Sequence, residues 1–131
     1  MTRPCDLTSR TILVLEDEPL IALDVEMALM DAGACVLGPV RDSPTAMDVI
    51  DRIVGNGSLS GAVLDVHLGS HTCEKVAVHL HDLDVPFVFY TGNLRDGDAF
   101  VRQLGAPVIR KPAPGHLLVS ALYQIMQPRG A

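Results

Sequence analysis

Short apolar segments alternate with amphipathic segments along this chain, and no other feature of the sequence constrains the fold as strongly. The apolar segments, which we predict to be strands, are residues 11–15, 35–40, 62–66, 87–91 and 107–110. The amphipathic segments, which we predict to be helices, begin at Pro19, Pro44, Lys75, Leu94 and Pro114. In such an alternation the strands run parallel, and the connecting helices cover both faces of the sheet. The sequence therefore predicts an α/β fold with a doubly wound, five-stranded parallel sheet.

The first two predicted helices have clear starts and clear apolar faces. Pro19 is suited to the first position of a helix, and Gly33 to the position after its end. The apolar stripe that we expect this helix to turn toward the core consists of Leu20, Leu23, Met27 and Met30. Ser43 is the expected N-cap of the second helix. The inner face of that helix is predicted to be Val49, Ile50 and Ile53.

The other predicted helices and loops are less sharply defined. Residues 55–58 have the composition of a loop, and the third helix is predicted over residues 75–83. The helix over residues 94–104 is the weakest, because Gly97 interrupts it. The last helix is predicted to end before Pro128 and Gly130.

The composition indicates one globular domain with its own core. Hydrophobic residues make up 48% and charged residues 20% of 131 residues, which excludes a disordered chain. No apolar run is long enough to span a membrane. The polar residues 1–10 contain no secretory signal, and we expect them to be an N-terminal extension of a domain over residues 11–127.

The charge and the cysteines narrow the possible partners and the compartment. A formal net charge of −6 disfavours contact with nucleic acid. The three cysteines, Cys5, Cys35 and Cys73, have no C-x-x-C spacing and do not indicate a disulfide framework. We therefore expect small buried cysteine side chains in a cytoplasmic protein.

Polar residues stand at the carboxyl ends of four of the five predicted strands. They are Glu16, Asp17 and Glu18 at the first strand, Asp65 at the third, Thr91 and Gly92 at the fourth, and Lys111 and Pro112 at the fifth. Ligands of open parallel sheets bind outside the carboxyl ends of the strands. We therefore expect these residues to form one site.

The residue types in this predicted site favour phosphoryl chemistry. Clustered carboxylates repel one another and favour a hard cation, and Mg²⁺ combines one or two carboxylates with waters and phosphate oxygens. Asp65 could then act as a nucleophile on phosphorus and form an aspartyl phosphate. Mg²⁺, the Lys111 ammonium and the Thr91 hydroxyl would neutralise the charge on the transferred group. Gly92 would leave room for that group, and Lys111–Pro112 is a candidate cis peptide.

Four segments of the sequence resemble the receiver domains of bacterial two-component systems. They are Leu-Glu-Asp-Glu-Pro at residues 15–19, Leu-Asp-Val at 64–66, Phe-Tyr-Thr-Gly at 89–92 and Arg-Lys-Pro at 110–112. The resemblance extends over residues 11–126 and implies the flavodoxin-like (βα)5 receiver fold, with strand order 2-1-3-4-5. It also implies a single-domain response regulator, which is a phosphoprotein of signal transduction rather than an enzyme.

The same resemblance implies a role for each site residue and names the partners. Asp65 would be the phosphoacceptor, Asp17 a direct Mg²⁺ ligand, Glu16 a water-mediated one, the His67 backbone carbonyl the third protein ligand, Thr91 the switch hydroxyl and Lys111 the phosphate-binding lysine. A sensor histidine kinase would supply the phosphoryl group, and an exposed part of the first helix could dock it. Output would pass through protein contacts, either to a histidine phosphotransfer protein of a phosphorelay or to a downstream target.

Two details of the resemblance bear on the subgroup and on the signal. Residues 89–94 are similar to a single-domain subgroup whose fourth strand ends in Phe-Ala-Thr-Gly and whose kinases are commonly of the HWE or a related class. Most receivers have Tyr or Phe three residues before the lysine, where this chain has Val108. The usual aromatic switch is therefore not expected here. The other departure is Glu16, at a position where Asp is commoner.

Some residues and functions have alternative interpretations. His67, His71 and Cys73 could suggest a transition-metal site, but their Gly/Ser-containing segment predicts solvated loop residues. His79, His81 and His116 are expected at the surface. A haloacid-dehalogenase-type phosphatase has a similar set of groups, but its nucleophile lies on the first strand rather than the third. A degenerate receiver that acts without phosphorylation is the other alternative.

Overall fold

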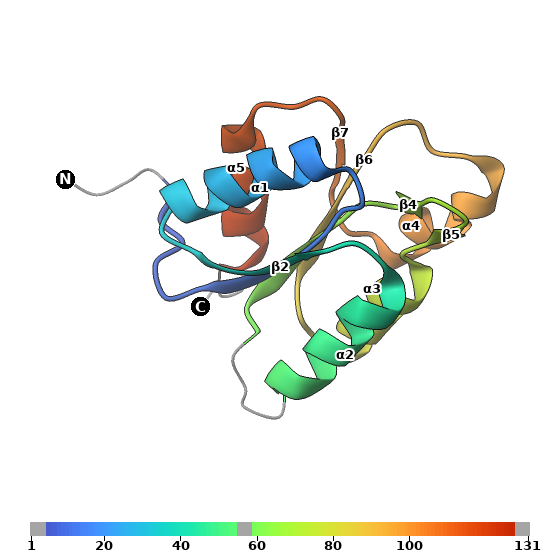
Figure 1. Ribbon diagram of the computed structural model, residues 1–131, viewed down its shortest axis with the longest axis horizontal. Helices are drawn as coiled ribbons and strands as arrows, with labels where there is room; N and C mark the ends of the chain where they lie inside the picture. The colour runs from blue at the N-terminus through green and yellow to red at the C-terminus, as the bar shows by residue number, and fades with distance from the viewer. Residues whose placement is uncertain (1–4, 55–58, 128–131) are drawn as a thin grey trace.

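The structure, a computed structural model, describes residues 5–54 and 59–127, and a parallel sheet lies at its centre (Figure 1). The five strands of this sheet are β1 (Thr11–Leu15), β2 (Cys35–Val40), β3 (Gly61–Leu64), β6 (Phe87–Thr91) and β7 (Val108–Arg110). They run parallel in the order β2-β1-β3-β6-β7. Counted along the chain this is the order 2-1-3-4-5, so the predicted topology is confirmed.

Helices cover both faces of this sheet (Figure 1). One layer consists of α1 (Pro19–Asp31) and α5 (Gly115–Ile125), and the other of α2 (Ser43–Val54), α3 (Glu74–Asp82) and α4 (Ala99–Leu104). Because alternate side chains of a strand point to opposite faces, β1 contributes to two cores. Ile12 and Val14 pack with α1 and α5, whereas Leu13 and Leu15 pack with α2, α3 and α4. Within the described ranges, none of these helices has the length and apolar character needed to cross a membrane.

The segment predicted as a helix over residues 94–104 forms a shorter helix. A 3-10 turn, η1 (Asp96–Asp98), comes first, and α4 starts only at Ala99. The carboxylate of Asp98 accepts the N–H of Arg95 at 2.7 Å, which closes the chain into a tight turn before the helix begins. The predicted loop at residues 55–58 and the predicted helix end at Pro128 and Gly130 lie outside the described residues.

The orientation predicted for the first helix is wrong. The side chains of Leu20, Leu23, Met27 and Met30, which we call the α1 stripe, are between 48% and 79% exposed. The buried residues of α1 are instead Ala22, Val25 and Leu29. Apolar residues occur all around this helix, so its sequence offers two apolar faces. The face on the sheet combines the small Ala22 and Val25 with Leu29, whereas the α1 stripe points away from the sheet.

Two smaller expectations also need correction, and one residue before β1 packs on the fold. Ser43 is the first residue of α2 rather than its cap, and the Asp42 carboxylate caps the helix by accepting the N–H of Thr45 at 2.9 Å. Cys35 is exposed, because it begins β2 at the edge of the sheet. Leu7 is fully buried against the core under α1 and α5, so part of the expected N-terminal extension packs on the fold.

Candidate phosphoryl-acceptor site

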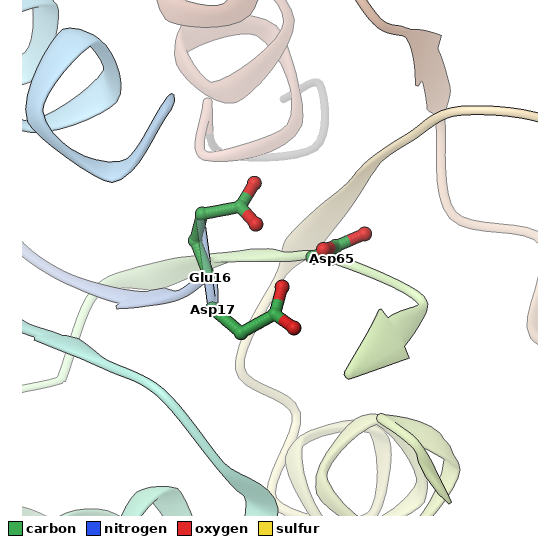
Figure 2. A group of neighbouring side chains, drawn as sticks. All are labelled: Glu16, Asp17 and Asp65. Carbon is green, nitrogen blue, oxygen red and sulfur yellow. The ribbon is translucent and has the colours of Figure 1, made fainter. Parts of the chain in front are cut away.

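The carboxylates that follow β1 and β3 lie together at one edge of the sheet (Figure 2). Glu16 and Asp17 come directly after β1, and Asp65 is the first residue after the neighbouring strand β3. One carboxylate oxygen from each lies within 4.8 Å of the other two. The N–H groups of Glu16 and Asp65 donate to the carbonyls of Val40 and Leu15, each at 2.9 Å. The backbone pairing of the sheet therefore continues into the site and sets the spacing of the carboxylates.

Lys111 brings a positive charge from β7 into this cluster. Its N–H donates to the carbonyl of Thr91 at 2.8 Å, which extends the pairing of β7 with β6. Its ammonium lies 2.6 Å from Oε1 of Glu16 and 3.2 Å from Oδ2 of Asp65. The same ammonium lies 5.7 Å from the centre of the Tyr90 ring. The Lys111–Pro112 peptide bond is cis.

Burial of these charges changes their acid–base behaviour. Burial, reinforced by the Asp65 carboxylate and opposed by Lys111, raises the pKa of Glu16 from its ordinary 4.5 to about 7. Burial alone would lower the pKa of Lys111, but hydrogen bonds and attraction from Glu16 and Asp65 outweigh it, so this pKa is raised. Glu16 therefore titrates near neutral pH, and a bound cation would favour its ionised form.

Thr91 and Gly92 stand at the end of β6, the strand next to β3, and so at the same edge of the sheet as the cluster. The Thr91 side chain is buried, and its hydroxyl has no hydrogen-bond partner among the described residues. A buried hydroxyl is normally bonded, so this one is suited to an acceptor such as a phosphoryl oxygen. A Cβ on Gly92 would meet no atom within 4 Å, so the structure shows no steric need for glycine there.

The segment that follows Asp65 is a hairpin rather than the expected solvated loop. Strands β4 (His67–Leu68) and β5 (His71–Thr72) pair antiparallel. Cys73 is fully buried behind them, and burial raises the pKa of its thiol. His67 points toward η1, where its Nε2 lies 2.8 Å from Oδ2 of Asp98. The alternative transition-metal group of His67, His71 and Cys73 is not formed, because the carboxylate cluster is the one close-packed set of possible metal ligands in the described part of the chain.

Asp98 is the residue of this region that the sequence did not identify. It is buried, and it lies 31 positions from His67 in the sequence. No local pattern connects two residues so far apart. A buried aspartate also looks like an ordinary turn residue when it stands beside Gly97.

Comparisons with known proteins agree with this geometry. No protein-family model matches the chain. A solved response regulator receiver protein from Sinorhizobium medicae superposes with a TM-score of 0.80 and 25% identity, over 95% of this chain and 100% of that one. The phyllosphere-induced regulator PhyR of Methylorubrum extorquens is 35% identical over 83 residues, which are 61% of this chain. The chain has the fold of the response-regulator receiver domains and is similar to them in sequence.

Two further comparisons define how far this similarity extends. The aligned segment spans 30% of the length of PhyR, so the similarity concerns one part of that protein. A response regulator from Burkholderia pseudomallei, solved with a phosphorylated aspartic acid, a calcium ion and citrate, superposes with a TM-score of 0.69 and 21% identity. That alignment covers 86% of this chain and 66% of the Burkholderia chain.

The surface beside the end of β7 is open at the position where the resemblance led us to look for an aromatic side chain. Val108 lies on β7 and is exposed. It borders a groove of about 430 Å³, which is also lined by Leu94, Val101 and Ala106. Val108 has no ring that could fill this groove, so the side chain at this position cannot move between a buried and an exposed rotamer as an aromatic would.

Proposed function

We propose that this receiver accepts a phosphoryl group on Asp65 from the phosphohistidine of a sensor histidine kinase. The observation that carries the proposal is that the Asp65 carboxylate clusters with two further carboxylates and lies 3.2 Å from the Lys111 ammonium. At the end of the neighbouring strand β6, the Thr91 hydroxyl has no hydrogen-bond partner among the described residues. A carboxylate oxygen of Asp65 would attack phosphorus as the bond from phosphorus to the histidine nitrogen breaks. The electron pair of that bond stays on the nitrogen of the kinase.

The residues of the receiver would bind and orient the transferred group. The Lys111 ammonium is already held beside Asp65, and it would form an ion pair with the phosphoryl oxygens once the group is transferred. The Thr91 hydroxyl would donate to one of these oxygens and so gain the partner that it lacks. Asp65 is held through its backbone by β1, so the nucleophile is in position before the kinase binds.

We propose Mg²⁺ as the cation of this site. All the available ligands are oxygens, and a small group of carboxylates with room for water and phosphate oxygens suits Mg²⁺. Asp17, Asp65, the His67 carbonyl and, through water, Glu16 would hold it. The ion would neutralise charge on the phosphoryl oxygens. The phosphorylated aspartic acid and calcium ion of the Burkholderia neighbour support a divalent cation in this kind of site.

We further propose that the exposed α1 stripe is where the kinase docks. It begins three residues after Asp17, and exposed apolar side chains at helical spacing form a contiguous surface suited to protein contact. A kinase of the HWE or a related class is the proposed donor. A histidine phosphotransfer protein or a downstream protein target would receive the signal in the cytoplasm. A net charge of −6 argues against nucleic acid as the target.

The proposed domain covers residues 11–127 and acts as a phosphoacceptor of signal transduction rather than as a turnover enzyme. The test is to incubate the protein with acetyl phosphate or a phosphorylated kinase in the presence of Mg²⁺ and to measure its mass. We expect the mass to increase by one phosphoryl group in the wild-type protein. We expect no such increase in Asp65→Asn, or in the wild-type protein when EDTA is present from the start. An equal amount of phosphorylation in Asp65→Asn would refute the assignment of the acceptor.

A further inference from the structure

One side-chain contact connects the segment after Asp65 directly to the start of α4. His67 lies two residues after Asp65, and its Nε2–H donates to Oδ2 of Asp98 at 2.8 Å, because an ionised carboxylate can only accept. The side chains are 18% and 3% exposed, so water competes little for this bond. A part-buried hydrogen bond to a charged acceptor is stronger than a surface ion pair.

At the α4 end, Asp98 determines how the helix begins. The oxygen that accepts from His67 also accepts the N–H of Arg95 at 2.7 Å. α4 starts at the next residue, and its Phe100 and Val101 side chains are buried. The Phe100 ring packs edge-on against Phe89 of β6, with 6.0 Å between ring centres. A displacement of Asp98 would therefore move both the turn before α4 and the first part of the helix.

At the other end, the hairpin holds His67 on a firm base. The N–H of Cys73 donates to the carbonyl of Val66 at 2.9 Å, and Leu68 is buried in the core. The N–H of Ser43 donates to Nε2 of His71 at 3.4 Å, and the Ser43 hydroxyl donates to a carbonyl of β5 at 3.2 Å, so α2 also supports the hairpin. With the hairpin held on these sides, a shift of the His67 backbone is passed to its side chain and to Asp98.

We propose that the His67–Asp98 hydrogen bond is a latch that couples the cation and phosphoryl site to α4. This inference rests on the proposed function, since it assigns the His67 backbone carbonyl to the cation and the His67 side chain to α4. The bond positions the carbonyl for the cation, and cation binding in turn fixes the turn before α4. Coupling between two sites is reciprocal. The factor by which the His67–Asp98 bond strengthens cation binding is therefore the factor by which the cation favours the bonded conformation at the start of α4.

The test is a double-mutant cycle on Mg²⁺ affinity, measured by titration calorimetry of the whole protein. His67→Phe removes the donor and keeps the backbone carbonyl, and Asp98→Ala removes the acceptor without touching any proposed ligand. We expect each to weaken Mg²⁺ binding roughly fivefold or more, the lower end of known coupling factors. In the double variant the two losses should not multiply. Asp98→Ala also removes the hydrogen bond from the Arg95 N–H. Because it does so whether residue 67 is His or Phe, this loss cancels in the cycle.

Two control variants separate the latch from charge and from general stability. Asp96→Ala removes an equal charge from an exposed position in the same 3-10 turn, and it should leave Mg²⁺ affinity nearly unchanged. His79→Phe removes the contact of His79 Nε2 with Oδ1 of Asp51, 3.1 Å apart at the surface. This variant should also leave Mg²⁺ affinity nearly unchanged. Equal losses in Asp96→Ala and Asp98→Ala, or losses that multiply in the double variant, would overturn the latch.

Amide hydrogen exchange of the metal-free protein gives an independent result. His67→Phe should speed exchange over residues 94–101, whereas His79→Phe should not. Unchanged exchange in His67→Phe overturns the latch whether or not the cation binds. If the wild-type protein binds no Mg²⁺, the cation of the proposed function is refuted, and faster exchange in His67→Phe alone would still support the contact between the hairpin and α4.

Discussion

Replacement of Glu16 by Gln should change how the stability of the metal-free protein depends on pH. The raised pKa of Glu16, about 7 against its ordinary 4.5, is due first to burial. With about 1.4 kcal/mol for each pKa unit, this rise corresponds to about 3 kcal/mol. The unfolded chain releases the Glu16 proton near pH 4.5, but the folded protein keeps it until about pH 7. The stability that this proton contributes is therefore fully present below pH 4.5, falls as the pH rises toward 7 and is lost above it.

Glu16→Gln removes this titration, so its free energy of unfolding should lack that fall. The assay is urea unfolding followed by far-UV circular dichroism in EDTA, at steps from pH 4.5 to 8. The free energy of unfolding of Glu16→Gln minus that of the wild type should rise by up to about 3 kcal/mol between pH 4.5 and pH 8. Glu18→Gln is the matched control, because Glu18 is an exposed neighbour that carries the same charge. A difference between Glu16→Gln and wild type that does not change with pH would refute the reasoning.

Two other variants test the metal site and the corrected orientation of α1. Asp17→Asn should abolish Mg²⁺ binding in calorimetry and raise the stability of the metal-free protein by up to about 1 kcal/mol, because it relieves repulsion among the carboxylates. Loss of stability, or normal Mg²⁺ affinity, would contradict this. Met27→Ser should change the free energy of urea unfolding by less than about 0.5 kcal/mol, whereas Leu29→Ala should cost about 2–5 kcal/mol. Equal costs for the two would contradict the exposed position of the α1 stripe.

The sheet and the candidate site could be predicted because both depend on signals that are local in the sequence. Strands buried on two faces are continuous apolar runs, and these are visible without any knowledge of their partners. β1 and β6 have the predicted boundaries for this reason. Once the strands are known to be parallel, their carboxyl ends must lie at one edge of the sheet. Glu16, Asp65 and Lys111 could thus be placed together from sequence position alone. In the structure, Lys111 Nζ lies 2.6 Å from the Glu16 carboxylate and 3.2 Å from the Asp65 carboxylate.

The orientation of α1 could not be predicted in the same way, because periodicity shows where apolar residues recur but not which apolar face is buried. Leu20 and Leu23 are more hydrophobic than Ala22, and the sequence therefore favours burying them. Close packing decides otherwise: a Cβ at Gly115 of α5 would come within 2.6 Å of the Ala28 Cβ, so α1 meets α5 through its small residues. This information lies in the partner helix and not in the sequence of α1.

The hairpin after β3 and its contact with Asp98 depend on tertiary structure in a further way. Two-residue strands such as β4 and β5 are too short to show a period, and a Gly/Ser-containing segment favours a loop. The path from the site to α4 is set by where this hairpin folds back, which no pattern in residues 67–72 specifies. Val108 on β7 is exposed and has no ring. The side chain that contacts the start of α4 is instead His67, from the hairpin that follows β3, and β3 lies on the other side of β6. On our proposal the segment after β3 therefore takes over, through His67, the transmission that an aromatic residue on β7 would otherwise provide.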